Sequence, residues 1–112
     1  MTIPELIDRL AKQPVAFADV MALIDERYAF TPTGFQNGEQ YNEAGTNNGS
    51  CKVFAFGALH QLSEQAALNA FGDFYTKDVL GNPHGEDHAN IRNFMRSGWA
   101  GIRFDGTALA LK

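Results

Sequence analysis

This sequence of 112 residues has no long hydrophobic run and no pair of cysteines. Its longest nearly apolar run covers residues 53–59, far short of the roughly 20 residues that a membrane-spanning helix needs. The single cysteine, Cys51, cannot form an internal disulfide, which is typical of a reducing cytoplasm. The first five residues lack the basic and apolar regions of a signal peptide. We therefore expect a cytoplasmic protein that does not span a membrane.

Positive charge is also scarce, since 9 Lys and Arg stand against 13 Asp and Glu and the formal net charge is -4. A general nucleic-acid binder relies on cations that neutralise phosphates, so the composition argues against that class. The apolar share of 45% is ordinary and argues against bulk disorder. A chain of this length can bury one core, and we expect a single domain over residues 1–112.

Glycine and asparagine are absent from the first 33 residues, while all 11 Gly and all 8 Asn lie in the range 34–106. The front end therefore lacks turn residues, and it shows helical periodicity instead. Thr2 and Glu5 have capping-box spacing for a first helix. A second helix is expected over about residues 16–27, so that the two form a helical hairpin.

The turn-rich remainder begins with a predicted β-hairpin. An Asn-Gly pair at 37–38 is a strong turn signal, so short strands are expected around residues 34–36 and 39–41. Ser50 can cap a helix that runs over about residues 51–60. That segment is apolar on nearly every side, which is typical of a buried helix. We expect it at the centre of the fold.

Three more elements complete the predicted fold. Ser63 has the position of an N-cap for a helix over about residues 64–77, and Asp87 has that position for a helix over 88–97. Residues 102–109 have the pattern of a strand, a two-residue turn and a second strand. The predicted class is α+β, with about five helices around a buried central helix and two short β-hairpins.

The loop before the central helix is the first candidate site. A glycine-rich loop that enters a helix N-terminus offers free backbone N–H groups and the positive end of the helix dipole, which suit a phosphate or a carboxylate. The spacing of Lys52 differs from the Walker pattern, so nucleotide binding is only weakly supported. The alternative is a capped turn that its own Asn and Ser side chains satisfy. The candidate ligand-binding residues are Gly45, Asn47, Asn48, Gly49, Ser50 and Lys52.

Arg92 and Arg96 form the second candidate site, on one face of the last predicted helix. No acidic residue occurs over residues 90–104, so this is the one cationic stretch in an acidic chain. Such a face can bind a phosphate or an acidic segment of a protein partner. The alternative is an ordinary solvated surface.

Cys51 is the third candidate, because a thiolate in the first turn of a helix is stabilised by the helix dipole. The segment 49–56 is loosely similar to the nucleophile segment of papain-like cysteine proteases. Such an enzyme also needs a histidine base and an oxyanion donor. The residues that can supply these parts are His88 and His84 for the base and Asn47 and Asn48 for the donor. The alternative is a small buried side chain, the usual state of a free cysteine.

Histidines and carboxylates are dense over residues 84–88, in the order His-Gly-Glu-Asp-His. Such a cluster can bind zinc or another divalent ion. No recognised ligand spacing occurs, however, and Asp87 has an alternative role as a helix cap. We therefore expect no metal site and no cofactor.

Distinctive short motifs are spread along the whole chain. They are Phe30-Thr31-Pro32-Thr33, Asn37-Gly38, Asn42-Glu43-Ala44-Gly45, Gly49-Ser50-Cys51-Lys52-Val53-Phe54-Ala55-Phe56, Phe71-Gly72, Asp87-His88, Asn90-Ile91-Arg92-Asn93-Phe94-Met95 and Gly98-Trp99. Together they resemble the HopJ type III effector family of small bacterial single-domain proteins. The resemblance implies a bacterial source and an effector role. It supplies no catalytic residue and no cofactor.

The leading hypothesis from the sequence is a non-enzymatic binding module for an anionic ligand or a protein partner. The alternative is a cysteine-dependent hydrolase or transferase that uses Cys51. A third is an interaction protein, which an exposed aromatic patch near residues 28–35 would reveal. Because residues 2–27 resemble folded helices rather than a polar export signal, we expect a protein that works inside the bacterium. The oligomeric state is left open.

Overall fold

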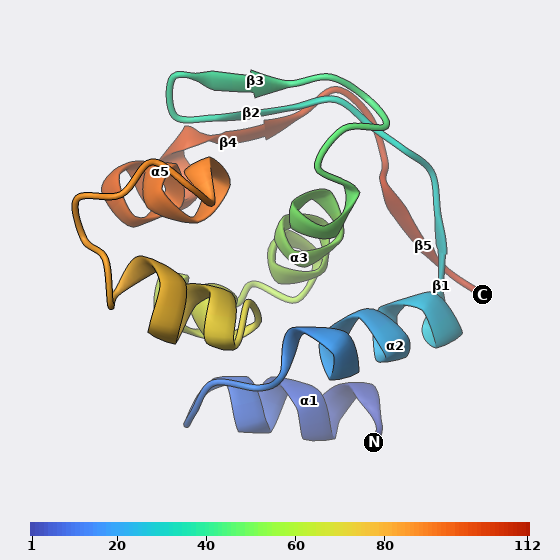
Figure 1. The fold of residues 1–112 in the computed structure, drawn as a ribbon. Helices are drawn as coiled ribbons and strands as arrows, with labels where there is room; N and C mark the ends of the chain where they lie inside the picture. The colour runs from blue at the N-terminus through green and yellow to red at the C-terminus, as the bar shows by residue number, and fades with distance from the viewer.

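The computed structural model describes residues 1–112 and has the predicted α+β class (Figure 1). The elements occur in the order α1 (Ile3–Leu10), α2 (Phe17–Arg27), β1 (Tyr28–Phe30), β2 (Phe35–Asn37), β3 (Gln40–Asn42), α3 (Asn48–Leu59), α4 (Glu64–Asn69), the π-helix η1 (Phe74–Val79), α5 (Ala89–Ser97), the 3-10 turn η2 (Gly98–Gly101), β4 (Ile102–Phe104) and β5 (Leu109–Leu111). No helix combines the length and the apolar character that crossing a bilayer requires.

The first two helices form as their sequences predict. The hydroxyl of Thr2 accepts the N–H of Glu5 and the Glu5 carboxylate accepts the N–H of Thr2, both at 3.2 Å, which completes the capping box of α1. Leu6 and Leu10 of α1 are fully buried. Helix α2 contacts α3, and α1 contacts α4.

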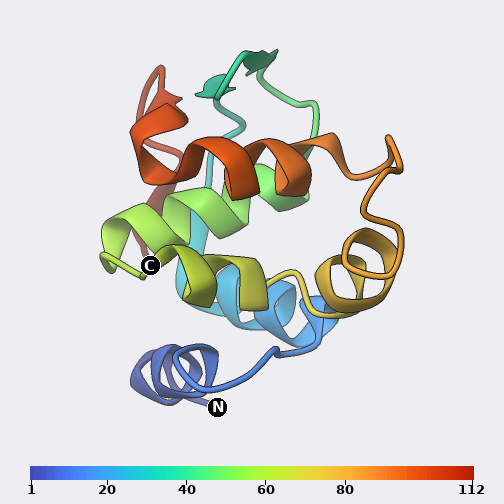
Figure 2. The ribbon, with the colours of Figure 1, turned by 90° about the vertical axis from the view of Figure 1, so that its left-hand side faces the viewer.

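Helix α3 is the centre of the core, as its apolar sequence predicts. Figure 2 shows it between α5 on one side and α2 and α4 on the other. Phe54 is fully buried at its midpoint. Its ring lies 4.9–6.3 Å from four aromatic rings, those of Phe35, Phe71, Phe94 and Trp99. Such clustered aromatic burial is worth several kcal/mol, on the order of 3–5 for a Phe→Ala change.

Two predicted helix caps are wrong. Helix α3 begins at Asn48, so Ser50 lies inside its first turn, and Asn47 is the N-cap. Helix α5 begins at Ala89, and His88 takes the cap position that was expected for Asp87. The Asp87 carboxylate instead forms an ion pair with Arg92, so it does not cap the helix.

The predicted helix over residues 64–77 is broken into two. Ser63 caps α4 as expected, through a bond from the Ala66 N–H to its hydroxyl at 3.1 Å. Gly72 then adopts a φ of +56°, which ends the α-helical path, and η1 continues in a new direction. The break fits Gly72 against the backbone before α2, where a Cβ would lie 2.8 Å from the carbonyl oxygen of Val15.

One predicted hairpin forms and the other does not. Strands β2 and β3 pair through a turn at Gly38 and Glu39, one residue later than predicted. The second hairpin is wrong, because β4 pairs with β2 and β5 pairs with β1 instead of with each other. Burial of Phe104 against Phe35, with ring centroids 5.4 Å apart, favours the distant pairing over the local one.

Candidate functional site

A pocket of about 340 Å³ lies where α3 and α5 begin. The first turns of these two helices are neighbours in Figure 2. The lining residues are Phe17, Gln40, Asn47, Gly49, Ser50, Phe71, Phe74, His88, Ala89, Asn90 and Ile91. The pocket therefore joins the loop singled out in the sequence to a second helix start.

Both helices begin without a side-chain cap. The N-cap residues Asn47 and His88 have φ angles of 49° and 51°, and neither side chain accepts a bond from its helix. The backbone N–H groups of residues 48–50 and 89–91 have no acceptor in the chain. The first N–H group that is bonded in α3 is that of Cys51, and the first in α5 is that of Arg92. The free N–H groups and positive dipole ends of two helices thus meet at one pocket.

A network of side-chain amides ties the two helix starts to the sheet. The Asn42 Oδ1 accepts bonds from Asn90, Asn47 and Gln40 at 2.8–3.0 Å. The Asn90 Oδ1 accepts bonds from Asn37 and Asn42 at 2.9 and 3.1 Å. Asn37, Asn42 and Asn90 are buried, so these bonds have little competition from water. Four of the eight asparagines of the sequence belong to this network, and they come from β2, β3, the N-cap of α3 and α5.

One wall of the pocket is aromatic. The Phe17 ring stacks on Phe71 with centroids 6.1 Å apart and meets Phe74 edge-on at 5.2 Å. Phe17 also packs on Gly49, where a Cβ would lie 2.7 Å from the ring. A second groove of about 350 Å³ shares this wall. The site therefore has a polar end of amide N–H groups beside an apolar surface.

The predicted loop residues divide into two groups. Gly49, Ser50 and Asn47 line the pocket, and the hydroxyl of Ser50 has no hydrogen-bond partner in the chain. Gly45, which has a φ of +90°, and Asn48 are exposed and are not part of the lining. Lys52 lies elsewhere, because its Nζ pairs with the Asp25 carboxylate at 2.7 Å and stacks over the Phe30 ring at 4.9 Å.

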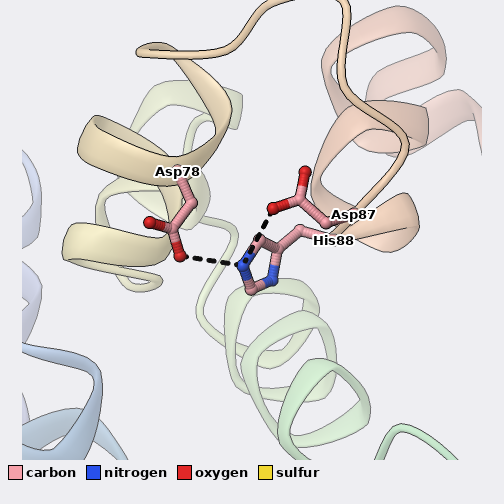
Figure 3. Close-up of side chains that lie close together, drawn as sticks. All are labelled: Asp78, Asp87 and His88. Atoms are coloured by element: carbon pink, nitrogen blue, oxygen red, sulfur yellow. Dashed lines mark hydrogen bonds and ion pairs between the residues drawn. The ribbon is translucent and has the colours of Figure 1, made fainter.

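His88 is the one histidine at the pocket, and it meets two carboxylates at the rim (Figure 3). Its Nε2 donates to the Asp78 Oδ2 at 3.0 Å and lies 3.8 Å from the Asp87 Oδ2. The Phe74 ring packs on the imidazole with centroids 5.1 Å apart. The structure thus brings Asp78, which has no marker in the sequence, to Asp87 and His88 of the segment 84–88. His84 is exposed and does not join this group.

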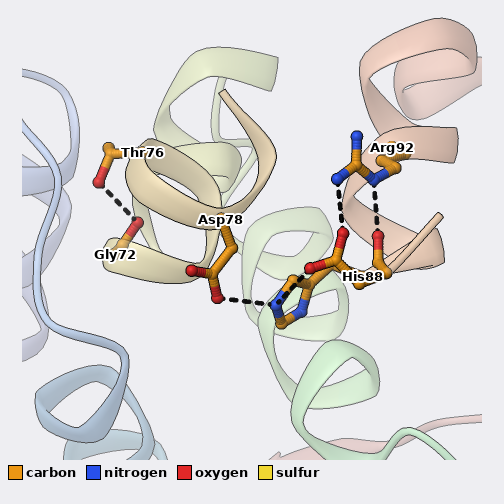
Figure 4. Close-up of polar contacts among 6 residues, drawn as sticks. Gly72, Thr76, Asp78, His88 and Arg92 are labelled. Atoms are coloured by element: carbon orange, nitrogen blue, oxygen red, sulfur yellow. Dashed lines mark hydrogen bonds and ion pairs between the residues drawn. The ribbon is translucent and has the colours of Figure 1, made fainter. Parts of the chain in front are cut away.

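Arg92 and Arg96 do not form a cationic face toward the loop. Arg92 is buried, and it donates through Nε to the Asp87 carbonyl and through Nη2 to the Asp87 Oδ1, both at 2.6 Å (Figure 4). Its Nη1 donates to the Asn82 carbonyl at 2.9 Å. The hydrogen bond from Arg92 holds the pKa of Asp87 below its usual value. Arg96 is exposed and donates to Asn93. Both arginines border a separate pocket of about 220 Å³.

Cys51 does not have the surroundings of a nucleophile. Its side chain is 1% exposed, and the thiol donates to the carbonyl oxygen of Thr33 at 3.5 Å. Burial raises the pKa of the Cys51 thiol, which opposes thiolate formation. The expectation of a Cys-His pair with His88 or His84 is therefore corrected, because the sulfur is covered and its partner is a backbone carbonyl.

The aromatic patch considered for residues 28–35 is also absent from the surface. Tyr28 and Phe35 are buried, and Phe30 is half-buried beneath Lys52. These side chains belong to the core or its edge, so this part of the chain offers no exposed aromatic surface for a partner.

Fold and pocket together define a small α+β domain in which a buried central helix and a second helix begin at one amide-lined pocket. The family model described as HopJ type III effector protein matches residues 3–109. The chain belongs to this family. Its structure is similar to the crystal structure of VPA0580, described as a protein of unknown function, with a TM-score of 0.96 and 49% sequence identity over 100% of this chain and 95% of that one. No curated protein matches the chain.

Proposed function

We propose that this protein is a non-enzymatic binding module for a small anionic ligand, which it holds in the pocket between α3 and α5. One observation carries the proposal: the uncapped N-termini of both helices line the same pocket. Each helix start presents three unpaired N–H groups, and both dipoles add positive potential where an anion would sit. Ser50 supplies a hydroxyl donor without a competing partner.

The aromatic wall narrows the class of ligand. A phosphate or carboxylate group fits the amide end, while an apolar part of the same molecule can lie on the rings of Phe17, Phe71 and Phe74. The volume of about 340 Å³ is at the small end of ligand pockets. We therefore propose a small organic anion rather than a nucleotide or a folded partner. An acidic peptide segment of a partner is the second candidate, since its carboxylates need the same donors.

A substitution at Ser50 tests the proposal. Ser50 is the third residue of α3, a position where an acidic side chain favours the helix dipole, so Ser50→Asp should fold. The new carboxylate would occupy the anion position and repel a ligand. In calorimetric titration with inorganic phosphate, we expect affinity at least about tenfold weaker for Ser50→Asp than for the wild type.

The matched control is Thr107→Asp, which changes the net charge equally at an exposed residue away from the pocket. It should bind phosphate as the wild type does. Equal binding by all three proteins, or no saturable binding by the wild type, would contradict the proposal.

We propose the bacterial cytoplasm as the place of action, and family membership keeps type III export open. The unpaired Cys51 and the folded α1 and α2 support a cytoplasmic protein. Immunoblots test this location. They compare cell and culture fractions from the native host with and without a working type III system. Recovery of the protein in a fraction secreted only when the system works would overturn it.

A further inference from the structure

We propose that Asp78, Asp87 and His88 form a binding site for a divalent transition-metal ion at the rim of the pocket (Figure 3). The three residues come from two parts of the chain: Asp78 lies in η1, and the consecutive residues Asp87 and His88 lie where the following loop enters α5. Because His88 also lines the pocket, an ion held here would lie at its edge.

The distances suit one ion. The His88 Nε2 lies 3.0 Å from the Asp78 Oδ2 and 3.8 Å from the Asp87 Oδ2, and all three ligand atoms lie within 4.8 Å of one another. A tetrahedral ion with bonds of roughly 2.0–2.2 Å places its ligand atoms about 3.3–3.6 Å apart. Small side-chain shifts therefore convert the present hydrogen-bonded arrangement into coordination, in which Nε2 binds the ion and Nδ1 carries the imidazole proton.

Two neighbours hold the ligands in this arrangement. The buried Arg92 donates to the Asp87 carbonyl and Oδ1, and the other carboxylate oxygen lies toward His88 (Figure 3). The Phe74 ring packs on one face of the imidazole. Outer contacts of this kind, to a ligating carboxylate and a ligating histidine, orient ligands in known metal sites. Arg92 acts here as a positioning residue, while the ligands themselves are the other three.

The ligand set indicates the kind of ion. One imidazole nitrogen and two carboxylate oxygens, without a thiolate, suit Zn²⁺ or Mn²⁺ rather than a soft ion such as Cu⁺. Three protein ligands leave at least one coordination position for water or another ligand. Asp78 and Asp87 carry two negative charges, and Arg92 carries one positive charge. The remaining negative charge favours a cation, although the positive end of the α5 dipole opposes it. The titration that tests the metal site contains no phosphate. Its outcome therefore does not depend on whether the pocket binds an anion.

The test is calorimetric titration of the full chain with ZnCl₂, using two ligand variants and one control. Asp78→Asn preserves the side-chain shape, and His88→Asn preserves tolerance of a positive φ at the N-cap. His84→Asn removes an exposed histidine of the same loop and serves as the control. We expect one Zn²⁺ per chain, with affinity reduced at least about tenfold in both ligand variants and unchanged in the control.

A second measurement locates the ion and guards against a variant that fails to fold. Mn²⁺ at substoichiometric amounts should broaden the amide NMR signals of Asp78, Asp87 and His88 in the wild-type protein before those of other residues. Absence of saturable Zn²⁺ binding, equal loss in the His84 control, or broadening centred elsewhere would overturn the proposal.

Discussion

The guanidinium of Arg92 donates to the Oδ1 of Asp87 at 2.6 Å and, through Nε, to the carbonyl of the same residue. This pair joins the first turn of α5 to the loop that leads into it. A third bond, to the Asn82 carbonyl, extends the tether to the start of the loop. Asp87 directly precedes His88, so the pair also places the N-cap of α5 at the pocket. Arg92 is predicted from the sequence to bind a ligand. In the structure it instead holds the segment that ends at His88, which lines the pocket.

Arg92→Lys should therefore reduce the free energy of unfolding by about 1–3 kcal/mol. Lysine keeps the charge but cannot reach both the Asp87 oxygens and the Asn82 carbonyl with one ammonium group, so at least one partly buried hydrogen bond is lost. Urea unfolding followed by circular dichroism measures the loss. Arg96→Lys, a change at an exposed arginine of the same helix, is the control and should be neutral. Equal stability of both variants would contradict the tether.

The elements that could be predicted from the sequence are those with local causes. The capping box of Thr2 and Glu5 and the apolar length of α3 each act within one segment, so these helices were predicted correctly. The second hairpin was predicted wrongly because strand choice depends on distant partners. Phe104 pairs with Phe35 in the sheet, and β5 pairs with β1, neither of which a local pattern can show.

The same distinction holds for the candidate site. The loop at 45–52 was predicted from glycine and asparagine before a buried helix, but the contact of its Asn47 with the network around Asn90 depends on the tertiary fold. Lys52 was assigned to the loop because it is adjacent in sequence, whereas the turn of the helix directs its side chain to Asp25 on α2. Asp78 carries no marker in the sequence, since only the π-helical path of η1 brings it to His88.

The contact between His60 and Tyr28 predicts a pH dependence of stability. The Tyr28 hydroxyl lies 2.5 Å from the His60 Nε2, and burial lowers the pKa of His60 below 6.5. The unfolded chain therefore binds the proton first, and this histidine destabilises the fold as the pH falls through 6.5 toward the lower folded pKa. Between about pH 7.5 and about pH 5.5, the wild type should lose more unfolding free energy than His60→Gln.

Urea titrations at the two pH values measure this difference. His84→Gln removes an exposed histidine instead and should follow the wild type. If His60→Gln and the wild type lose equal stability over the interval, the lowered pKa of the half-buried His60 is refuted.

The burial of Cys51 predicts slow thiol chemistry. With 1% of the side chain exposed and its pKa raised, Cys51 should react with a disulfide reagent such as DTNB only as fast as the protein opens. The labelling rate should rise steeply as urea approaches the unfolding midpoint. A free thiol in a short peptide over residues 49–54 provides the unprotected rate. Native labelling as fast as that of the peptide would reinstate Cys51 as a reactive group.

Gly72 should be among the glycines least tolerant of substitution. Its φ of +56° strains an L-amino acid, and a Cβ would lie 2.8 Å from the carbonyl oxygen of Val15 and 3.0 Å from the backbone nitrogen of Phe17. Gly72→Ala should reduce the free energy of unfolding by about 2 kcal/mol. Gly106→Ala, whose new methyl group would lie no nearer than 3.8 Å, from the Thr33 Cγ2, should change it by less than about 0.5 kcal/mol. Thermal and urea unfolding compare the two, and similar losses would contradict this account of the break before η1.

The central claim is that the starts of α3 and α5 together bind an anion, and NMR titration with inorganic phosphate tests it most directly. The amide signals of Gly49, Ser50, Asn90 and Ile91 should shift together and saturate with one dissociation constant, because both helix starts line one pocket. The signal of Gly45, outside the lining, should move little. Signals at both helix starts that stay unmoved at millimolar phosphate, or shifts confined to one helix, would contradict the claim.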